Sequence, residues 1–137
     1  MYQEFDIVMN GNSEEGSIFG YISDCDDNFL NFLENNDYFE KDFDSLEKYK
    51  NCIKAYICNM YVNEEYRGDG NGKYLMNEIL EDMYYSNSAK YVFLICDNIE
   101  SNDFSLQKWY ESYGFKVIKD KYNCPLMVLG SDDEDEE

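Results

Sequence analysis

A glycine-rich segment in the middle of the chain has the residue types of a phosphate-binding loop. Its glycines, Gly68, Gly70 and Gly72, alternate with other residues, and Arg67 and Lys73 flank them. Glycine has no Cβ, so the backbone can curl at these positions and direct several N–H groups into one concavity. An amphipathic run follows the segment, and the start of a helix adds unpaired N–H donors and a positive dipole end. We therefore expect a phosphate or diphosphate group to bind here.

The spacing of this segment does not fit the common phosphate and calcium loops. A Walker A loop needs Ser or Thr after its lysine, but Tyr74 follows Lys73. A dinucleotide fingerprint needs GxGxxG after the first strand, whereas this chain has GxGxG in its middle. A calcium loop that begins at Asp69 would need glycine in place of Tyr74 and glutamate in place of Leu80. A glycine-rich turn that binds no ligand remains the alternative.

A second pattern lies nearer the C-terminus, where the residues from Trp109 to Phe115 read WYESYGF. Trp109, Tyr110 and Tyr113 fall on one face of an expected helix. Gly114 fits the left-handed position after that helix, with Phe115 folding back as its apolar partner. Tyr110 is then either a core aromatic on the helix stripe or a residue with a chemical role.

The remaining pattern predicts the elements that position these two segments. The run YVFLIC lacks alternation, so we expect a strand buried on both faces. Turn chemistry rich in Asn, Gly and Ser predicts a turn over 10–16. The strands are expected at 4–9, 17–23, 54–62, 91–96, 115–119 and 126–129, and the helices at 72–85, at 103–113 and twice within 27–50, with a break at 35–37. This order predicts an α/β chain with a mixed sheet and helices on its faces.

The spacing Arg67-x-x-Gly70-x-Gly72 resembles the acyl-CoA loop of the GNAT (Gcn5-related N-acetyltransferase) superfamily, written Q/R-x-x-G-x-G/A. The segment from Tyr110 to Phe115 resembles the second signature of that superfamily, Tyr-Glu-x-x-Gly-Phe. The resemblance covers roughly residues 54–129. It implies the GNAT fold, a mixed antiparallel and parallel (α+β) sheet of about six to seven strands flanked by about four helices, with splayed central strands.

The resemblance further implies an N-acetyltransferase that moves acetyl from acetyl-CoA to a primary amine by direct attack. The acceptor would be a protein lysine, an N-terminus or a small cationic amine. Acetyl-CoA would enter between the strands 54–62 and 91–96. Tyr110 would protonate the CoA thiolate, because a phenol pKa of about 10 lies near that of a thiol; Tyr113 is the weaker alternative. The cofactor-binding residues would be Met60, Tyr61, Val62, Arg67, Gly68, Asp69, Gly70, Asn71, Gly72, Lys73, Asn98 and Asn102.

The general base is less clear from the sequence. Some members of the superfamily have a glutamate within the central strand, but here that strand reads KAYICNMYV. Glu64 and Glu65, which follow it, are the candidate catalytic carboxylates, singly or through water. Asp97 and the cluster of Asp24, Asp26 and Asp27 are further substitutes. Solvated surface positions are the alternative for each of these acids.

The charge of the chain limits its partners. Thirty acidic and eleven basic residues give a formal net charge of −19. This disfavours nucleic acid and anionic membranes and favours a cationic amine or a basic protein. The opposing hypothesis is a catalytically inactive acidic binding protein on a GNAT scaffold, which mimics nucleic acid or inhibits a basic partner. The acidic run at 131–137 fits either and is expected to be a disordered tail after a single domain over 1–130.

Cysteine and histidine content bounds the chemistry and the compartment. The chain has no histidine, which excludes a Ser-His-Asp triad, and no metal site is expected. Five cysteines without CxxC spacing are typical of reduced core cysteines, so we expect a cytoplasmic protein. No signal peptide and no membrane span is recognised. The sequence leaves room for a homodimer.

Overall fold

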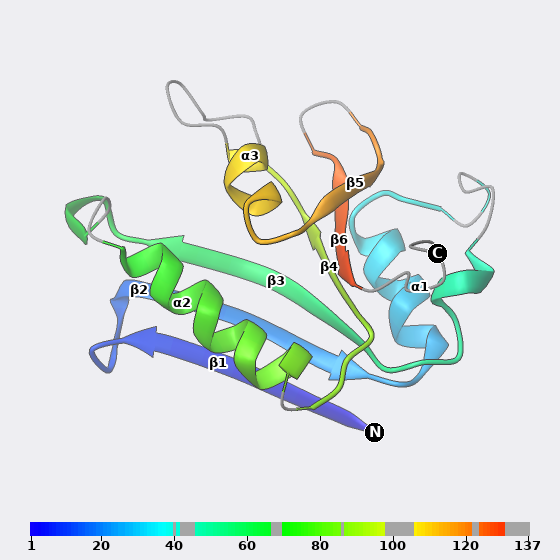
Figure 1. Cartoon of the computed structure of the whole chain (residues 1–137), viewed down its shortest axis with the longest axis horizontal. Coiled ribbons are helices and arrows are strands. Elements are labelled where there is room, and N and C mark those ends of the chain that lie inside the picture. Colours follow the sequence, from blue (N-terminus) through cyan, green and yellow to red (C-terminus); the bar gives the residue numbers. More distant parts are fainter. Residues whose placement is uncertain are drawn as a thin grey trace.

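A computed structural model describes residues 1–39, 41, 46–66, 70–85, 87–97, 106–121 and 124–130, apart from the side chains of Ser13 and Glu64. The described part forms one mixed sheet of six strands with three α-helices (Figure 1). The strand order is β1-β2-β3-β4-β6-β5. The strands are β1 (Tyr2–Met9), β2 (Asn12–Ser23), β3 (Lys54–Val62), β4 (Tyr91–Ile95), β5 (Lys116–Lys119) and β6 (Leu126–Gly130). The α/β mixed sheet expected from the sequence is confirmed.

The β1–β2 hairpin turns within two residues. Asn10 and Gly11 both have positive φ, at 51° and 71°, which is the backbone that a tight hairpin turn between twisted strands requires. β2 therefore begins at Asn12, and the turn expected over 10–16 was too long. Because Asn10 and Gly11 already reverse the chain direction, the Asn and Ser residues that follow them can belong to the strand.

The two faces of the sheet are covered by different helices. Ala55 and Ile57 lie in one hydrophobic cluster, together with the buried residues of α2 (Asn71–Leu80). Tyr56, between them in sequence, lies in the other cluster, together with α1 (Asp26–Asn35). Because successive side chains of a strand point to opposite faces, α1 and α2 cover opposite faces of β3.

The helices differ from expectation at one place. A second helix before β3 is wrong for the described residues, because the chain forms only a 3-10 turn, Glu47–Tyr49, there. Leu46 and Tyr49 are buried three residues apart, a spacing that a single 3-10 turn satisfies as well as an α-helix does. α2 continues as a π turn over Glu81–Tyr85, and α3 spans Leu106–Glu111. Gly114 has φ +106°, the positive value that was expected after α3.

β3 and β4 begin side by side and then part. They are parallel and pair from Lys54 with Tyr91 to Ile57 with Leu94. At the next residue the register of β3 with β2 shifts, which leaves Cys58 as an extra residue opposite the Phe19–Gly20 step of β2. Such a bulge bends its strand and increases its twist. Beyond it β3 runs on beside β2, and Figure 1 shows the ribbons of β3 and β4 diverging below α3. We call the first four residues of β3 its narrow end and the segment 58–62 its wide end.

A buried ion pair closes the narrow end. Lys54 is fully buried, and its Nζ lies 3.0 Å from an Asp26 carboxylate oxygen at the start of α1. The same ammonium donates to the carbonyl of Cys52 at 3.2 Å and lies 5.3 Å from the centre of the Phe29 ring. The backbone N–H of Asn51 donates to the same carboxylate at 3.1 Å. Charge and hydrogen bonds are therefore matched around the buried ammonium, while the Asp26 side chain remains 30% exposed.

The five cysteines form no disulfide, but they are not all in the core. Cys96 is buried, whereas Cys25 and Cys58 are exposed, so the expectation of core cysteines is wrong for these two. Cys58 is exposed because it is the bulge residue. Among the described residues, none of the helices combines the length and apolar character that a membrane crossing requires. The acidic segment 131–137 lies outside the described residues.

Candidate functional site

The start of α2 is shaped to receive a ligand. Gly70 is the N-cap residue, with φ +83° and ψ 7°, and no side chain of the described residues caps the helix there. A Cβ at Gly70 would have none of the described atoms within 4 Å, so on their side the space in front of the backbone is open. The carbonyl of Gly70 accepts the first helical hydrogen bond, from the N–H of Tyr74 at 2.9 Å. The helix thus presents its positive end beside a backbone that carries no side chain.

This helix start lies at the wide end of β3. A Cβ on Gly72 would be 3.3 Å from the Met60 side chain of β3 and 3.6 Å from the Trp109 ring of α3. The side chain of Asn71 donates to the carbonyl of Tyr66 at 2.7 Å, which ties the helix start to the turn after β3. The glycine at 72 therefore favours the close approach of three elements, which holds the helix entrance beside Met60 and Trp109.

The wide end of β3 presents the three strand residues of the expected site. Met60, Tyr61 and Val62 pair with β2, and β4 has no pairing with them among the described residues. The side chains of Met60 and Val62 pack against the core below α2. Tyr61 points the other way and is 43% exposed. The opposite backbone edge of this segment faces the diverging β4, where an added extended chain could pair with it.

Tyr110 lies within the core near the end of β4. Its side chain is 7% exposed and contacts the rings of Trp109 and Phe115, at centroid distances of 5.4 and 6.0 Å. Burial first, and then the neighbouring Cys96 and Asp97, raise the pKa of Tyr110 to about 12. The phenol stays protonated throughout the neutral range. It is a weaker acid than a free phenol, so it suits donation of a hydrogen bond to a developing thiolate better than early release of its proton.

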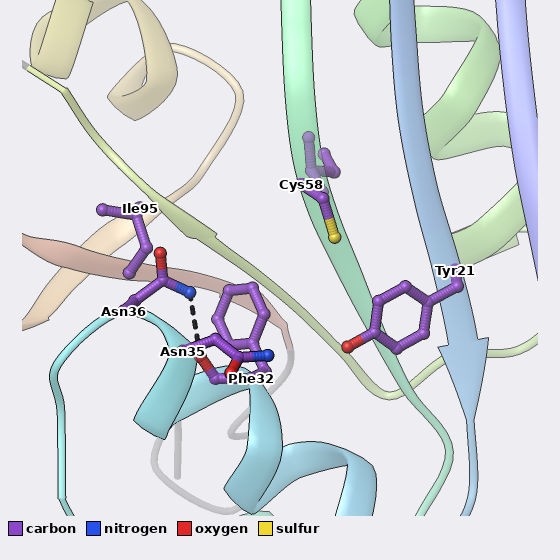
Figure 2. Close-up of a pocket in the computed structure, with 7 residues that line it drawn as sticks. Tyr21, Phe32, Asn35, Asn36, Cys58 and Ile95 are labelled. Atoms are coloured by element: carbon purple, nitrogen blue, oxygen red, sulfur yellow. Dashed lines mark hydrogen bonds between the residues drawn. The ribbon is translucent and has the colours of Figure 1, made fainter.

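A pocket of about 280 Å³ opens on the α1 face at the point where β3 and β4 part (Figure 2). Ile57 is the last residue of β3 that pairs with β4, Cys58 is the bulge, and Ile95 ends β4. The lining residues come from β2, α1, β3 and β4 and are Tyr21, Phe32, Asn35, Asn36, Ile57, Cys58 and Ile95. The pocket and the start of α2 therefore lie on opposite faces of the sheet and meet at the same divergence.

The described lining of this pocket is uncharged. Burial first, and then Cys58 and Tyr2, raise the pKa of Tyr21 to about 12. Burial raises the pKa of the Cys58 thiol to about 11, although the side chain reaches solvent. Both groups are neutral near pH 7. The Asn36 amide donates to the Phe32 carbonyl at 2.8 Å, which holds the end of α1 in place beside the pocket.

For some residues expected at the site, the structure gives no position. Arg67, Gly68, Asp69, Asn98 and Asn102 lie outside the described residues.

The expected catalytic carboxylates have different surroundings. Glu64 and Glu65 form a 3-10 turn after β3; Glu65 is exposed and its N–H donates to the Asn63 side chain at 2.9 Å. Lys73, on the other flank of the loop, is also exposed. Asp26 belongs to the narrow end, away from the divergence. Within the described ranges, no cluster of three or more His, Cys, Asp or Glu side chains is arranged to hold a metal ion.

The sequence missed the pocket residues. The sequence predicts Asn35 and Asn36 only as the break after the first helix, and Cys58 as a core residue of its strand. The exposure of Cys58 depends on one extra residue relative to β2, and that difference has no local signature in KAYICNMYV. The end of α1 is recognisable as a polar pair after an apolar face, but its place beside β4 follows from tertiary packing.

The sequence of residues 13–117, more than half of the chain, matches the family model of the acetyltransferase (GNAT) domain. The chain belongs to the GNAT acetyltransferase family. No curated protein sequence matches it significantly.

Solved structures share the fold of this GNAT domain. An acetyltransferase from Bacillus cereus ATCC 14579 is 16% identical with a TM-score of 0.56, over 93% of this chain and 73% of that one. PH1933 from Pyrococcus horikoshii OT3 is 19% identical with a TM-score of 0.55, over 85% and 58%. Arabidopsis thaliana Naa50, in complex with the bisubstrate analogue CoA-Ac-MVNAL, is 18% identical with a TM-score of 0.54, over 85% and 65%. The match thus spans 58% and 65% of the last two proteins.

Proposed function

We propose that this GNAT domain transfers an acetyl group from acetyl-CoA to a primary amine by direct attack. The observation that carries the proposal is the start of α2, where Gly70 and the uncapped helix end face open space beside the wide end of β3. An uncapped helix start with a side-chain-free backbone suits the diphosphate of coenzyme A. The Arabidopsis relative, which was solved with a CoA analogue, is consistent with this assignment through its fold.

The chain's own groups have separate tasks toward the donor. The backbone N–H groups from Gly70 to Lys73, with Arg67, Gly68 and Asp69 before them, bind the diphosphate. The backbone of Met60, Tyr61 and Val62 pairs with the amides of the pantetheine arm as an added strand would. One of these N–H groups polarises the thioester carbonyl. Asn98 and Asn102, which follow β4 in the sequence, are the remaining residues proposed to bind acetyl-CoA. Acetyl-CoA supplies the acetyl group as an activated thioester.

Tyr110 delivers a hydrogen bond, and then a proton, to the departing sulfur. Its position beside Cys96 at the end of β4 and its protonated state at neutral pH suit this role. Because its pKa of about 12 lies above that of a thiol, complete transfer of the proton is uphill, and the hydrogen bond from the phenol supplies most of the stabilisation of the developing thiolate. Tyr113 is partly exposed and is the weaker alternative.

Cys58 does not form an acetylated intermediate in this mechanism. Its thiol lines the pocket at the divergence, but its pKa of about 11 leaves it almost entirely protonated near pH 7. The amine therefore attacks the thioester directly. Its proton passes to water, or through water to Glu64 or Glu65, which lie after the wide end of β3.

The wider setting of the proposal follows from composition. We take 1–130 as one acetyltransferase domain with an acidic tail at 131–137. A cationic amine or basic protein suits the net charge of −19, and the free cysteines suit the cytoplasm. Neither the family match nor the structural relatives support the inactive alternative.

The test is calorimetric titration of acetyl-CoA into the protein and into a Gly70→Val variant. Valine adds bulk in the open space and strain at φ +83°, so we expect at least a tenfold loss of affinity. Gly11→Val is the matched control, because Gly11 also has positive φ and open surroundings but lies at the hairpin of β1 and β2. Both variants should lose about 1–2 kcal/mol of stability through strain. Equal cofactor affinity in the two variants would place the diphosphate elsewhere.

A further inference from the structure

The pocket at the divergence has the position of an acceptor site. It opens on the α1 face, whereas the start of α2 lies on the other face, and both reach the point where β3 and β4 part. Ligand pockets commonly measure about 300–1,000 Å³, and this one, at about 280 Å³, is at the small end of that range. It admits a small molecule or the end of a chain, but not a folded surface.

The lining of the pocket favours an uncharged body on the acceptor. Of the described residues that line it, none is charged. A free amino acid would bring a carboxylate without a cationic partner, and a polyamine would bring a second ammonium without an anionic one. The rings of Tyr21 and Phe32 already contact the Tyr56 ring, at 4.8 and 4.9 Å between centroids. The pocket therefore presents apolar side-chain atoms together with the side-chain amides of Asn35 and Asn36 to a ligand.

The amine nitrogen attacks only in its uncharged form, and the proposed proton acceptors Glu64 and Glu65 do not belong to the described lining of the pocket. The chain has no histidine, and the described lining offers no carboxylate to take a proton. With ordinary pKa values of about 7.8 for a peptide α-amine and about 10.4 for lysine, roughly a third of the former and roughly 0.1% of the latter is neutral at pH 7.5. The reactive form of an α-amine is thus about 250 times more abundant than that of lysine.

We infer that the acceptor is the α-amine of a peptide whose first side chain is apolar, seated in the pocket between Tyr21, Phe32 and Ile95. This inference rests on the proposed acetyl transfer. Figure 2 shows the Tyr21 hydroxyl turned toward the space that Cys58 and Asn35 also border. The apolar edges receive the first side chain, and the amide of Asn35 hydrogen-bonds the peptide main chain, which needs both a donor and an acceptor.

The transfer balances as follows at the atoms concerned. The α-amine nitrogen forms a bond to the acetyl carbon, and the carbon–sulfur bond of the thioester breaks with its electron pair on sulfur. The nitrogen loses one proton to water, the sulfur takes one from Tyr110, and Tyr110 recovers its proton from water, so the products are the acetylated peptide and the CoA thiol. Tyr21 and Cys58, the titratable groups that line the pocket from β2 and β3, stay neutral up to about pH 9. The pH profile therefore reports the acceptor amine.

The first test reads peptide binding without catalysis. The alkylation rates of Cys58 and Cys25 are measured by mass spectrometry, with acetyl-CoA absent, in the presence of a hexapeptide that begins Met-Leu. We expect at least fivefold protection of Cys58 and none of Cys25, an exposed thiol that does not line the pocket. A matched peptide that begins Glu-Leu should need at least a tenfold higher concentration to give the same protection. Equal protection by both peptides, or none by either, would overturn the inference.

A variant sharpens the test. Asn35→Asp introduces a carboxylate of the same shape into the lining, so we expect peptides that begin with lysine to gain protection of Cys58 relative to those that begin with methionine. Glu34→Gln, at an exposed neighbouring position on α1, is the matched control and should leave the order of peptides unchanged. An unchanged order in Asn35→Asp would show that the first side chain does not enter this pocket.

The second test compares two acceptors with acetyl-CoA present. One hexapeptide has a free α-amine and an acetylated lysine, and its partner has a blocked α-amine and a free lysine. We expect transfer to the first to be at least a hundredfold faster, with a rate that rises tenfold per pH unit and levels off near pH 8. Preferred transfer to lysine, or to no peptide while acetyl-CoA binds, overturns the inference alone. Loss of acetyl-CoA binding as well would overturn the proposed function.

Discussion

The two ends of β3 are built on opposite principles. At the narrow end, Lys54 is fully buried, its charge is matched by Asp26, and the strand pairs on both sides. At the wide end, Cys58 is exposed, and among the described residues the strand pairs only with β2. One end of β3 is therefore paired on both sides and contains an ion pair, and the other end leaves one side of the strand open for a ligand. Stability and binding are separated by a few residues along the chain.

This separation has an energetic reason. A buried ion pair is strongly destabilising when one partner is removed, so it suits a place that no ligand needs to enter. Unpaired backbone is costly in a core but useful where an added chain can complete the sheet. Substitutions at the two ends should therefore affect different measurements.

The largest effect is expected at the narrow end. Asp26→Ala leaves the Lys54 ammonium buried without its partner, which should lower the free energy of unfolding by about 3–5 kcal/mol. Urea unfolding measures this, and acetyl-CoA affinity of the folded variant should be unchanged. Asp27→Ala, at an exposed neighbouring position, is the control and should cost less than about 1 kcal/mol. If the two variants were equally stable, the ion pair would have no special role.

At the wide end, the main effect should be on rate. Tyr110→Phe removes the proton donor and keeps the ring, so we expect about a hundredfold lower turnover with unchanged acetyl-CoA affinity. Steady-state kinetics and calorimetry separate the two quantities. Tyr113→Phe, on the same helix end, should retain most of the turnover. A parallel loss of affinity and turnover in Tyr110→Phe would mark this tyrosine as structural only.

Acid should weaken the narrow end before it affects the wide end. Burial raises the pKa of Asp26, but the hydrogen bond and charge from Lys54 outweigh it, and the net pKa is lowered. A depressed folded-state pKa gives stability that is present above the unfolded value of about 3.9 and is lost as the pH falls through the folded value. We expect Asp26→Asn to make the unfolding free energy depend less on pH below about pH 5. Urea titrations at several pH values measure this dependence. An unchanged slope would argue against this linkage.

The smallest effect is expected at the bulge. Cys58→Ala should change the free energy of unfolding by less than about 0.5 kcal/mol, because the side chain is exposed, and it should keep kcat and alter only the KM for the peptide whose pocket it lines. Cys96→Ala is the matched comparison: it empties a buried position and should cost about 1–2 kcal/mol. Thermal unfolding and a transfer assay measure both. Loss of transfer in Cys58→Ala alone would indicate an acetylated thiol.

The fold and half of the site could be predicted from local patterns. The glycine spacing around Gly70 and the apolar helix face that contains Tyr110 depend only on residues close in sequence. Both patterns can therefore be recognised without knowledge of the tertiary structure. The pocket was not predictable in this way, because Asn35 and Cys58 meet only through the packing of α1 against the diverging strands. The sequence predicts a helix where the structure has the 3-10 turn Glu47–Tyr49. Two buried residues three positions apart fit the period of an α-helix and that of a 3-10 turn equally well.

We expect the extra residue at Cys58 to set how far β3 and β4 diverge. The number of residues in β3 would then determine the width of the opening between them, more than the size of any side chain. Because the bulge offsets β3 from β2 by one position, deleting a residue there would restore even register and let β3 run straight alongside β4. We expect substitutions within the lining to reshape the cavity and a deletion at the bulge to narrow the opening itself. Variation in this molecule's acceptor range should therefore be sought first in gaps of a sequence alignment at this position.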